Sequence, residues 1–163
     1  MTLDTAAIIA ETRAWVDRAV IGLNLCPFAK AVQVKGQIRY VVCPTSEPAE
    51  LLNTLCDELH RLAESDPQDV DTTLLIHPAA LTDFLDFNDF LAVADAAVEE
   101  HGYAGILQVA SFHPQFQFAD THINDVSNAT NRAPFPTLHL LRESSIDRAV
   151  AAFPEAETIF EAN

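Results

Sequence analysis

The chain has 163 residues, 49% of them hydrophobic, and a formal net charge of -15 from 24 Asp and Glu against nine Lys and Arg. This length and apolar content favour a single domain over residues 1–163 with one buried core. The acidic charge repels nucleic acid and anionic lipid, and no apolar run reaches the ~18 residues of a membrane span, so neither is an expected partner. Three cysteines and no export signal favour reduced thiols in a soluble, cytoplasmic protein.

Helical and strand-like segments alternate along the chain. Helical spacing of Ile8, Thr12, Trp15, Ala19 and Leu23 predicts a first amphipathic helix, with Asp4 or Thr5 as its cap and an end near Gly22. The next elements in chain order are a strand over 37–43, a helix capped by Ser46 with a leucine stripe over 51–62, a strand over 72–76, a helix from Thr82 through Glu100, a strand over 106–112, a strand over 137–141 and a last helix from Ser144 or Ser145 through Phe153.

This alternation predicts an α/β fold with a four-stranded mixed sheet and helical crossovers. The first three strands are expected to be parallel, because each is followed by a helix that returns the chain to the same end of the sheet. The fourth strand follows a long loop and could run either way. A ferredoxin-like α+β sandwich is the alternative, and it would place the strand ends at opposite edges.

Cysteine or histidine directly precedes proline at four places, and three of these pairs end a predicted strand. The pairs are Cys26-Pro27, Cys43-Pro44, His77-Pro78 and His113-Pro114. If the strands are parallel, their carboxyl ends share the edge where open α/β sheets bind ligands. The pairs could also be simple strand ends, because the residue before proline favours extended geometry.

Two groups of residues have the chemistry of metal ligands. Cys43, His77 and His113 could hold zinc with one open position, if the strand ends converge. Asp120, His122 and Asp125 form a second candidate, with donors that suit Mn, Fe or Zn. Neither group has the local spacing of a specific metal motif, so strand ends and a polar loop remain the alternatives.

A cysteine could serve as a nucleophile. Cys26 precedes Pro27, and His113 or His77 could lower its pKa from roughly 8.5 and act as its base. The other interpretation is a buried apolar cysteine.

The loop over 115–136 is long enough to suggest a functional role. Asn128, Asn131 and Arg132 offer amide and guanidinium donors within five residues, which suits capture of a carboxylate or phosphate. Arg132 could instead pair with a carboxylate of its own loop. The four glycines form neither a P-loop nor a dinucleotide fingerprint, so the sequence identifies no cofactor.

Three ordered motifs resemble a bacterial family called domain of unknown function 1415. They are Gly22-Leu-Asn-Leu-Cys-Pro-Phe-Ala29, Phe112-His-Pro-Gln-Phe-Gln-Phe118 and Asn131-Arg-Ala-Pro-Phe-Pro-Thr-Leu-His-Leu-Leu-Arg-Glu143. The resemblance implies a bacterial cytoplasmic protein whose signature residues include Cys26, His113, Asn131 and Arg132. It implies no activity.

These observations lead to one functional hypothesis and one alternative. The first is an enzyme that acts on a small anionic substrate, with His113 as general acid/base, Arg132, Asn131 and Asn128 as the anion anchor, and Cys26 as nucleophile or pocket wall. The alternative is a non-catalytic domain that binds a metabolite, a metal or a protein. The reaction type and the oligomeric state do not follow from the sequence.

Overall fold

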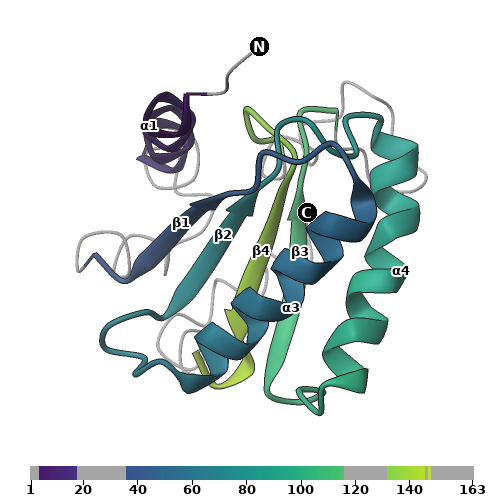
Figure 1. The fold of residues 1–163 in the computed structure, drawn as a ribbon. Helices are drawn as coiled ribbons and strands as arrows, with labels where there is room; N and C mark the ends of the chain where they lie inside the picture. Colours follow the sequence, from purple (N-terminus) through teal and green to yellow (C-terminus); the bar gives the residue numbers. More distant parts are fainter. Residues whose placement is uncertain (1–3, 18–35, 116–131, 146, 148–163) are drawn as a thin grey trace.

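The computed structural model describes residues 4–17, 36–115, 132–145 and 147. Helices pack on both faces of one sheet (Figure 1). In chain order the elements are α1 (Thr5–Trp15), β1 (Ile38–Val42), α3 (Pro48–Glu64), β2 (Thr72–Ile76), α4 (Phe84–Glu100), β3 (Leu107–Phe112) and β4 (Thr137–Arg142). None of these helices is long and apolar enough to cross a membrane.

The four strands form a mixed sheet in the order β1-β2-β4-β3. β1 and β2 are parallel, and β4 is antiparallel to both of its neighbours, β2 and β3. β1, β2 and β3 therefore all point the same way, while β4 runs in the opposite direction. The predicted α/β class with a four-stranded mixed sheet is confirmed, and the strand directions differ from those of the ferredoxin-like alternative.

The position of β4 was not predicted. The sequence predicted three parallel strands joined by crossovers but not their order, and β4 lies between β2 and β3 and separates them. Its register pairs Ile76 with Thr137 on one side and Thr137 with Phe112 on the other. β4, the last strand among the described residues, is therefore a central strand of the sheet.

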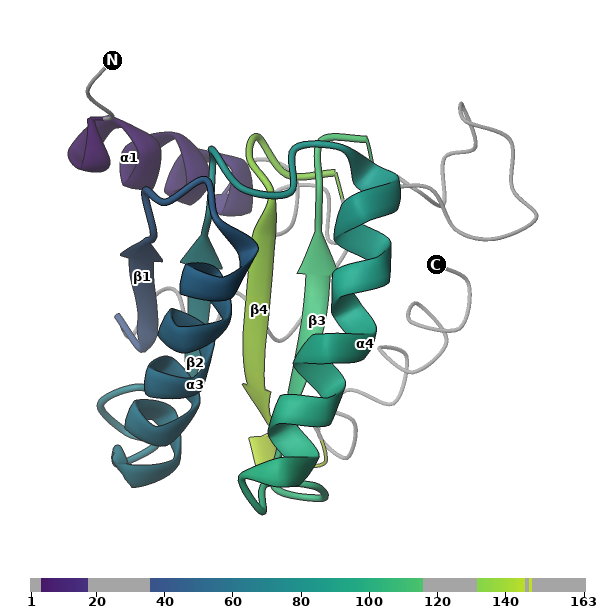
Figure 2. The same ribbon diagram turned by 45° about the vertical axis from the view of Figure 1, so that its right-hand side comes forward.

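Each face of the sheet has its own hydrophobic cluster. α3 and α4 cover one face, and their leucine and phenylalanine side chains pack on residues such as Leu75 and Leu140, which are fully buried. α1 crosses the other face near the carboxyl ends of β1 and β2 (Figure 2). There Trp15 packs edge-on against Phe112, with ring centroids 5.1 Å apart. Alternation of side chains along each strand supplies apolar groups to both layers.

The helix starts differ slightly from those expected. Asp4 caps α1, as one of the two predicted candidates, by accepting a hydrogen bond from the Ala7 amide. α3 begins at Pro48 with Glu47 rather than Ser46 as its cap residue, because proline is favoured in the first helical turn. Asp83 replaces Thr82 as the cap of α4, where its carboxylate accepts from the Leu85 amide.

Candidate functional site

The carboxyl ends of β1, β2 and β3 meet at one edge of the sheet. Cys43, His77 and His113 each follow the last residue of one of these strands. The Cys43 amide donates to the Ile76 carbonyl (2.8 Å), and the His77 amide donates to the Pro136 carbonyl (2.9 Å). The three residues therefore lie in one row across the edge, as the parallel strand ends predicted. Because neighbouring strands are about 4.8 Å apart, β4 separates the backbones of His77 and His113 by roughly 10 Å.

The two histidine rings meet on a single phenylalanine of α4. The Phe87 ring centroid lies 5.6 Å from that of His77 and 5.1 Å from that of His113. All three side chains are fully buried, with His77 at 0% and His113 at 1% exposure. The predicted convergence of strand ends thus occurs for the two histidines, inside the layer between the sheet and α4.

Hydrogen bonds to the backbone determine which nitrogen of each ring carries the proton. The His77 Nδ1 lies 2.9 Å from the Ala80 carbonyl, which can only accept, so Nδ1 is the donor. The His113 Nε2 donates to the Leu81 carbonyl (3.1 Å), and its Nδ1 accepts from the Gln115 amide (3.0 Å). His77 Nε2 is left as a buried acceptor with no hydrogen-bond partner in the described part of the chain.

Both rings are neutral at pH 7. Burial lowers the pKa of His77 to about 4, despite the opposing effect of its bond to Ala80. Burial also lowers the pKa of His113, and its bond to the Leu81 carbonyl opposes this change. A proton added to either ring would place a charge in an apolar layer, which is the physical reason for both directions.

The two histidines fix the turn that joins β2 to α4. Their rings bond to the carbonyls of consecutive residues, Ala80 and Leu81. Leu81 has a φ of 55°, in the left-handed region that residues other than glycine, asparagine and aspartate seldom adopt. Such a conformation persists only where the surroundings hold it, and it is concentrated at functional sites.

Cys43 does not join the histidine pair. Its Sγ lies 3.6 Å from the Thr54 hydroxyl of α3, and the residue is buried in the hydrophobic cluster beneath that helix. Within residues 4–17, 36–115, 132–145 and 147, no three His, Cys, Asp or Glu side chains are grouped so that they could hold a metal ion. The structure therefore brings together two of the three residues in the first metal candidate, and not as a ligand set.

Arg132 lies in the segment that leads into β4 at the same edge. It is half-buried and lies just before Ala133, which packs with Trp15 and Leu74 on the α1 face of the sheet. Four residues later, the Pro136 carbonyl accepts the hydrogen bond from the His77 amide. The other predicted residues lie outside the described part of the chain: Cys26, Asp120, His122, Asp125, Asn128 and Asn131.

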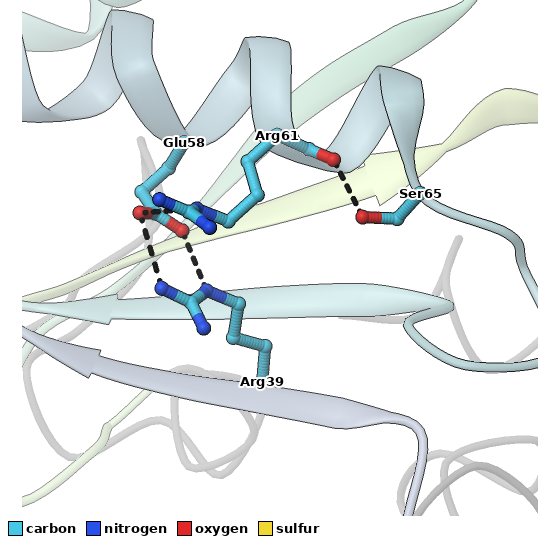
Figure 3. Close-up of polar contacts among 4 residues, drawn as sticks. All are labelled: Arg39, Glu58, Arg61 and Ser65. Atoms are coloured by element: carbon cyan, nitrogen blue, oxygen red, sulfur yellow. Dashed lines mark hydrogen bonds and ion pairs between the residues drawn. The ribbon is translucent and has the colours of Figure 1, made fainter.

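Several other arginines have identifiable roles in the fold. Arg39 of β1 and Arg61 of α3 both approach the buried carboxylate of Glu58, at 2.9 and 3.5 Å (Figure 3). The Nη2 group of Arg142 donates to the carbonyls of Leu62 and Ser65 at the end of α3 and of Val70 in the loop before β2. These contacts join helix to sheet.

Sequence reasoning missed a second pair of histidines. His60 of α3 and His101 at the end of α4 have ring centroids 5.0 Å apart, and the Tyr103 hydroxyl bonds to His60 Nδ1 at 2.5 Å. Both histidines are exposed, and a shallow hollow beside them is lined by Asp57, His60, Arg61 and Glu64. Residues on exposed turns of two separate helices give no periodic signal, so the pair could be found only from the packing of α3 against α4.

Comparisons with known proteins give one finding. Residues 7–163 match the model of a family described as protein of unknown function, DUF1415. No curated protein and no solved structure matches the chain.

Proposed function

Because the chain belongs to the DUF1415 family, whose description assigns no activity, we propose its function from the site itself: the protein binds a small anionic molecule at the carboxyl edge of its sheet, with Arg132 as the anchor. The observation that carries this proposal is that Arg132 begins the segment that leads to the row of strand ends. The segment from Arg132 to Pro136 reaches the row of strand ends, where the His77 amide bonds to Pro136.

The chemistry of Arg132 supports an anionic ligand. A guanidinium group presents several donors in one plane and can bind a carboxylate or phosphate through two parallel hydrogen bonds. In the sequence, no lysine or arginine occurs between Arg61 and Arg132. Arg132 is therefore the first basic residue after a long acidic stretch of the sequence.

The helix starts at this edge could also bind an anion through their backbone amides, but the structure favours the Arg132 guanidinium. α3 and α4 both begin here, and the start of a helix carries partial positive charge. Asp83, however, already accepts from the Leu85 amide at the start of α4. A ligand would meet this carboxylate before the helix amides, so we assign the anion to Arg132, with Asn131 and Asn128 as the further donors of the same loop.

In this proposal the histidine pair positions the site. His77 and His113 are neutral at pH 7 and hold the Ala80 and Leu81 carbonyls, so the turn beside the ligand keeps one shape. Replacing either ring with a side chain that cannot donate at the same place would leave a buried carbonyl without its partner.

An enzyme that acts on the bound anion is the second candidate. The observation that favours it is the neutral state of His113, which a general base needs at pH 7. Cys26 would serve as nucleophile or pocket wall. Proton exchange at His113 requires that its bond to Leu81 or to the Gln115 amide opens, because each ring nitrogen holds one of them.

Thermal unfolding in the presence of anions tests the binding proposal. The panel would hold inorganic phosphate, sugar phosphates and small di- and tricarboxylates, each compared with chloride at equal ionic strength. A ligand at about 100 times its Kd should raise Tm by roughly 5–10 °C. Arg132→Gln should abolish this increase, whereas Arg61→Gln, which removes an exposed arginine of α3, should preserve it.

Two outcomes would contradict the proposal: no anion stabilises the protein, or the two variants lose stabilisation equally. His113→Asn separates the two candidates once a ligand is found. For an enzyme this variant should lose turnover while keeping most of the ligand-induced increase in Tm. A binding protein should show no turnover in either form.

A further inference from the structure

The outward face of α4 carries exposed apolar side chains. Leu85 is 70% exposed and Val93 is 44% exposed, although the opposite side of the same helix is buried in the core. Together with Ile106, in the turn after α4, they are the large hydrophobic residues that stand exposed in the described ranges of the chain. A contiguous apolar patch on one helix face indicates a contact surface, whereas single exposed apolar residues are common on any protein, so the neighbours of these side chains decide between the two.

Helical spacing aligns Leu85 with two small residues on the same face of α4. Leu85, Asp89, Ala92 and Ala96 follow one another at intervals of four, three and four residues, so they form a line along the helix, and all are exposed. Alanine at two successive turns would allow the backbone of another helix to approach closely. Leu85 would then pack into a groove of that second helix.

Charge of a single sign surrounds the line. From its cap to its last residue, α4 contains no lysine, arginine or histidine, and its carboxylates are Asp83, Asp86, Asp89, Asp95, Glu99 and Glu100. Glu99 and Glu100 lie in the last turn, where the helix dipole disfavours negative charge. Their placement therefore does not serve the stability of the helix.

α3 provides a contrast within the same layer. It shows no large exposed hydrophobic residue, and one of its carboxylates, Glu58, is paired with Arg39 and Arg61. Both helices pack on the same face of the sheet, so the exposed apolar line and the unmixed acidic charge are properties of α4 rather than of the layer.

We propose that the outward face of α4 binds a basic amphipathic helix of a partner protein. Apolar residues of that helix contact Leu85, Ala92 and Ala96, and its lysines or arginines pair with Asp89 within the line and with the carboxylates on either side. A second copy of this chain fits less well, because two α4 faces would bring carboxylates together with no basic residue between them. Leu85 lies in the first turn of α4, near the edge of the proposed anion site, but the inference uses neither Arg132 nor the histidine pair and therefore does not depend on that site.

A synthetic helical peptide provides the probe. It would carry a leucine and alanine stripe flanked by lysines, and a second peptide would have the same composition in a permuted order without the stripe. Titration of the full chain labelled with ¹⁵N should shift amide resonances along α4, and the permuted peptide should bind at least tenfold more weakly. Leu85→Ser should weaken binding by about tenfold, because Leu85 is the most exposed large apolar side chain of α4.

Matched charge reversals distinguish the proposed face from general attraction to an acidic protein. Asp89→Lys on α4 should weaken binding strongly, whereas Asp57→Lys, at an exposed site on α3, should weaken it only slightly. Equal effects of the two reversals, equal binding of the two peptides, or no binding would overturn the proposal. So would a dimer in sedimentation velocity that Leu85→Ser dissociates, because the face would then belong to a second copy.

Discussion

Two pairs of histidines occupy opposite ends of the layer between α3, α4 and the sheet, and their surroundings differ. His77 and His113 are buried on either side of Phe87 at the carboxyl edge, and backbone carbonyls fix their protons. His60 and His101 lie exposed at the other end, where the rings contact each other and His60 contacts Tyr103. Histidine thus positions a turn where it is buried, and it lies on the surface of the protein where it is exposed.

The largest expected effect comes from removing the ring that the buried pair shares. Phe87→Ala should lower the free energy of unfolding by about 3–5 kcal/mol, because it leaves a cavity between two fully buried histidines. Urea denaturation measures this loss. Leu85→Ala, at an exposed position of the same helix, is the matched control and should change stability by less than about 0.5 kcal/mol. Similar losses in the two variants would show that Phe87 is not a core residue.

The second-largest expected effect is a loss of folding stability on acidification, caused by the buried histidines. The pKa of His77 is about 4 in the folded protein and 6.5 in its ordinary state, so below pH 6.5 the unfolded chain binds protons that the folded chain excludes. Stability is therefore complete above pH 6.5 and falls between pH 6.5 and about 4, by about 3 kcal/mol for this residue.

His139 should contribute in the same direction, since burial lowers its pKa to about 4 as well. His77→Gln should flatten the pH dependence of unfolding between pH 4 and 6.5 relative to the native chain. Histidine proton resonances offer a direct check, because the His77 ring should titrate near pH 4. A midpoint near 6.5 would mean that the ring is hydrated and that the turn is not held as described.

The smallest effect is expected at the exposed pair. Tyr103→Phe removes the hydroxyl that bonds to His60, and because water can replace that bond the loss should stay below about 1 kcal/mol. Equilibrium unfolding at pH 7 measures it. A loss as large as that of Phe87→Ala would mean that the exposed pair holds α3 to α4, and the contrast between the two pairs would disappear.

Much of the fold could be predicted from local patterns. The alternation of helices and strands identified the α/β class, and the proline after Cys43, His77 and His113 located three strand ends that share one edge. The insertion of β4 between β2 and β3 could not be predicted in this way. Thr72 pairs with Leu141 across 69 residues, and such a long-range pairing depends on packing rather than on local spacing.

The candidate site was harder to predict for a related reason. His113 was identified as a chemical group, but its two ring nitrogens bond to the Leu81 carbonyl and the Gln115 amide. Arg142 likewise donates to the carbonyls of Leu62, Ser65 and Val70, which are more than 70 residues away in the sequence. Residue type indicates what a side chain can bind, whereas the tertiary fold determines which partner lies within hydrogen-bond distance.

The central position of β4 has a consequence for synthesis. A ribosome makes β1, β2 and β3 first, but β3 cannot join the other two until β4 has been made, because its described strand partner is β4. Until then, the uncharged segment from Leu107 to Phe112 leaves its backbone groups open to other chains. Nascent chains that stop before residue 137 should therefore be aggregation-prone, and release of the last strand should be the step that protects them.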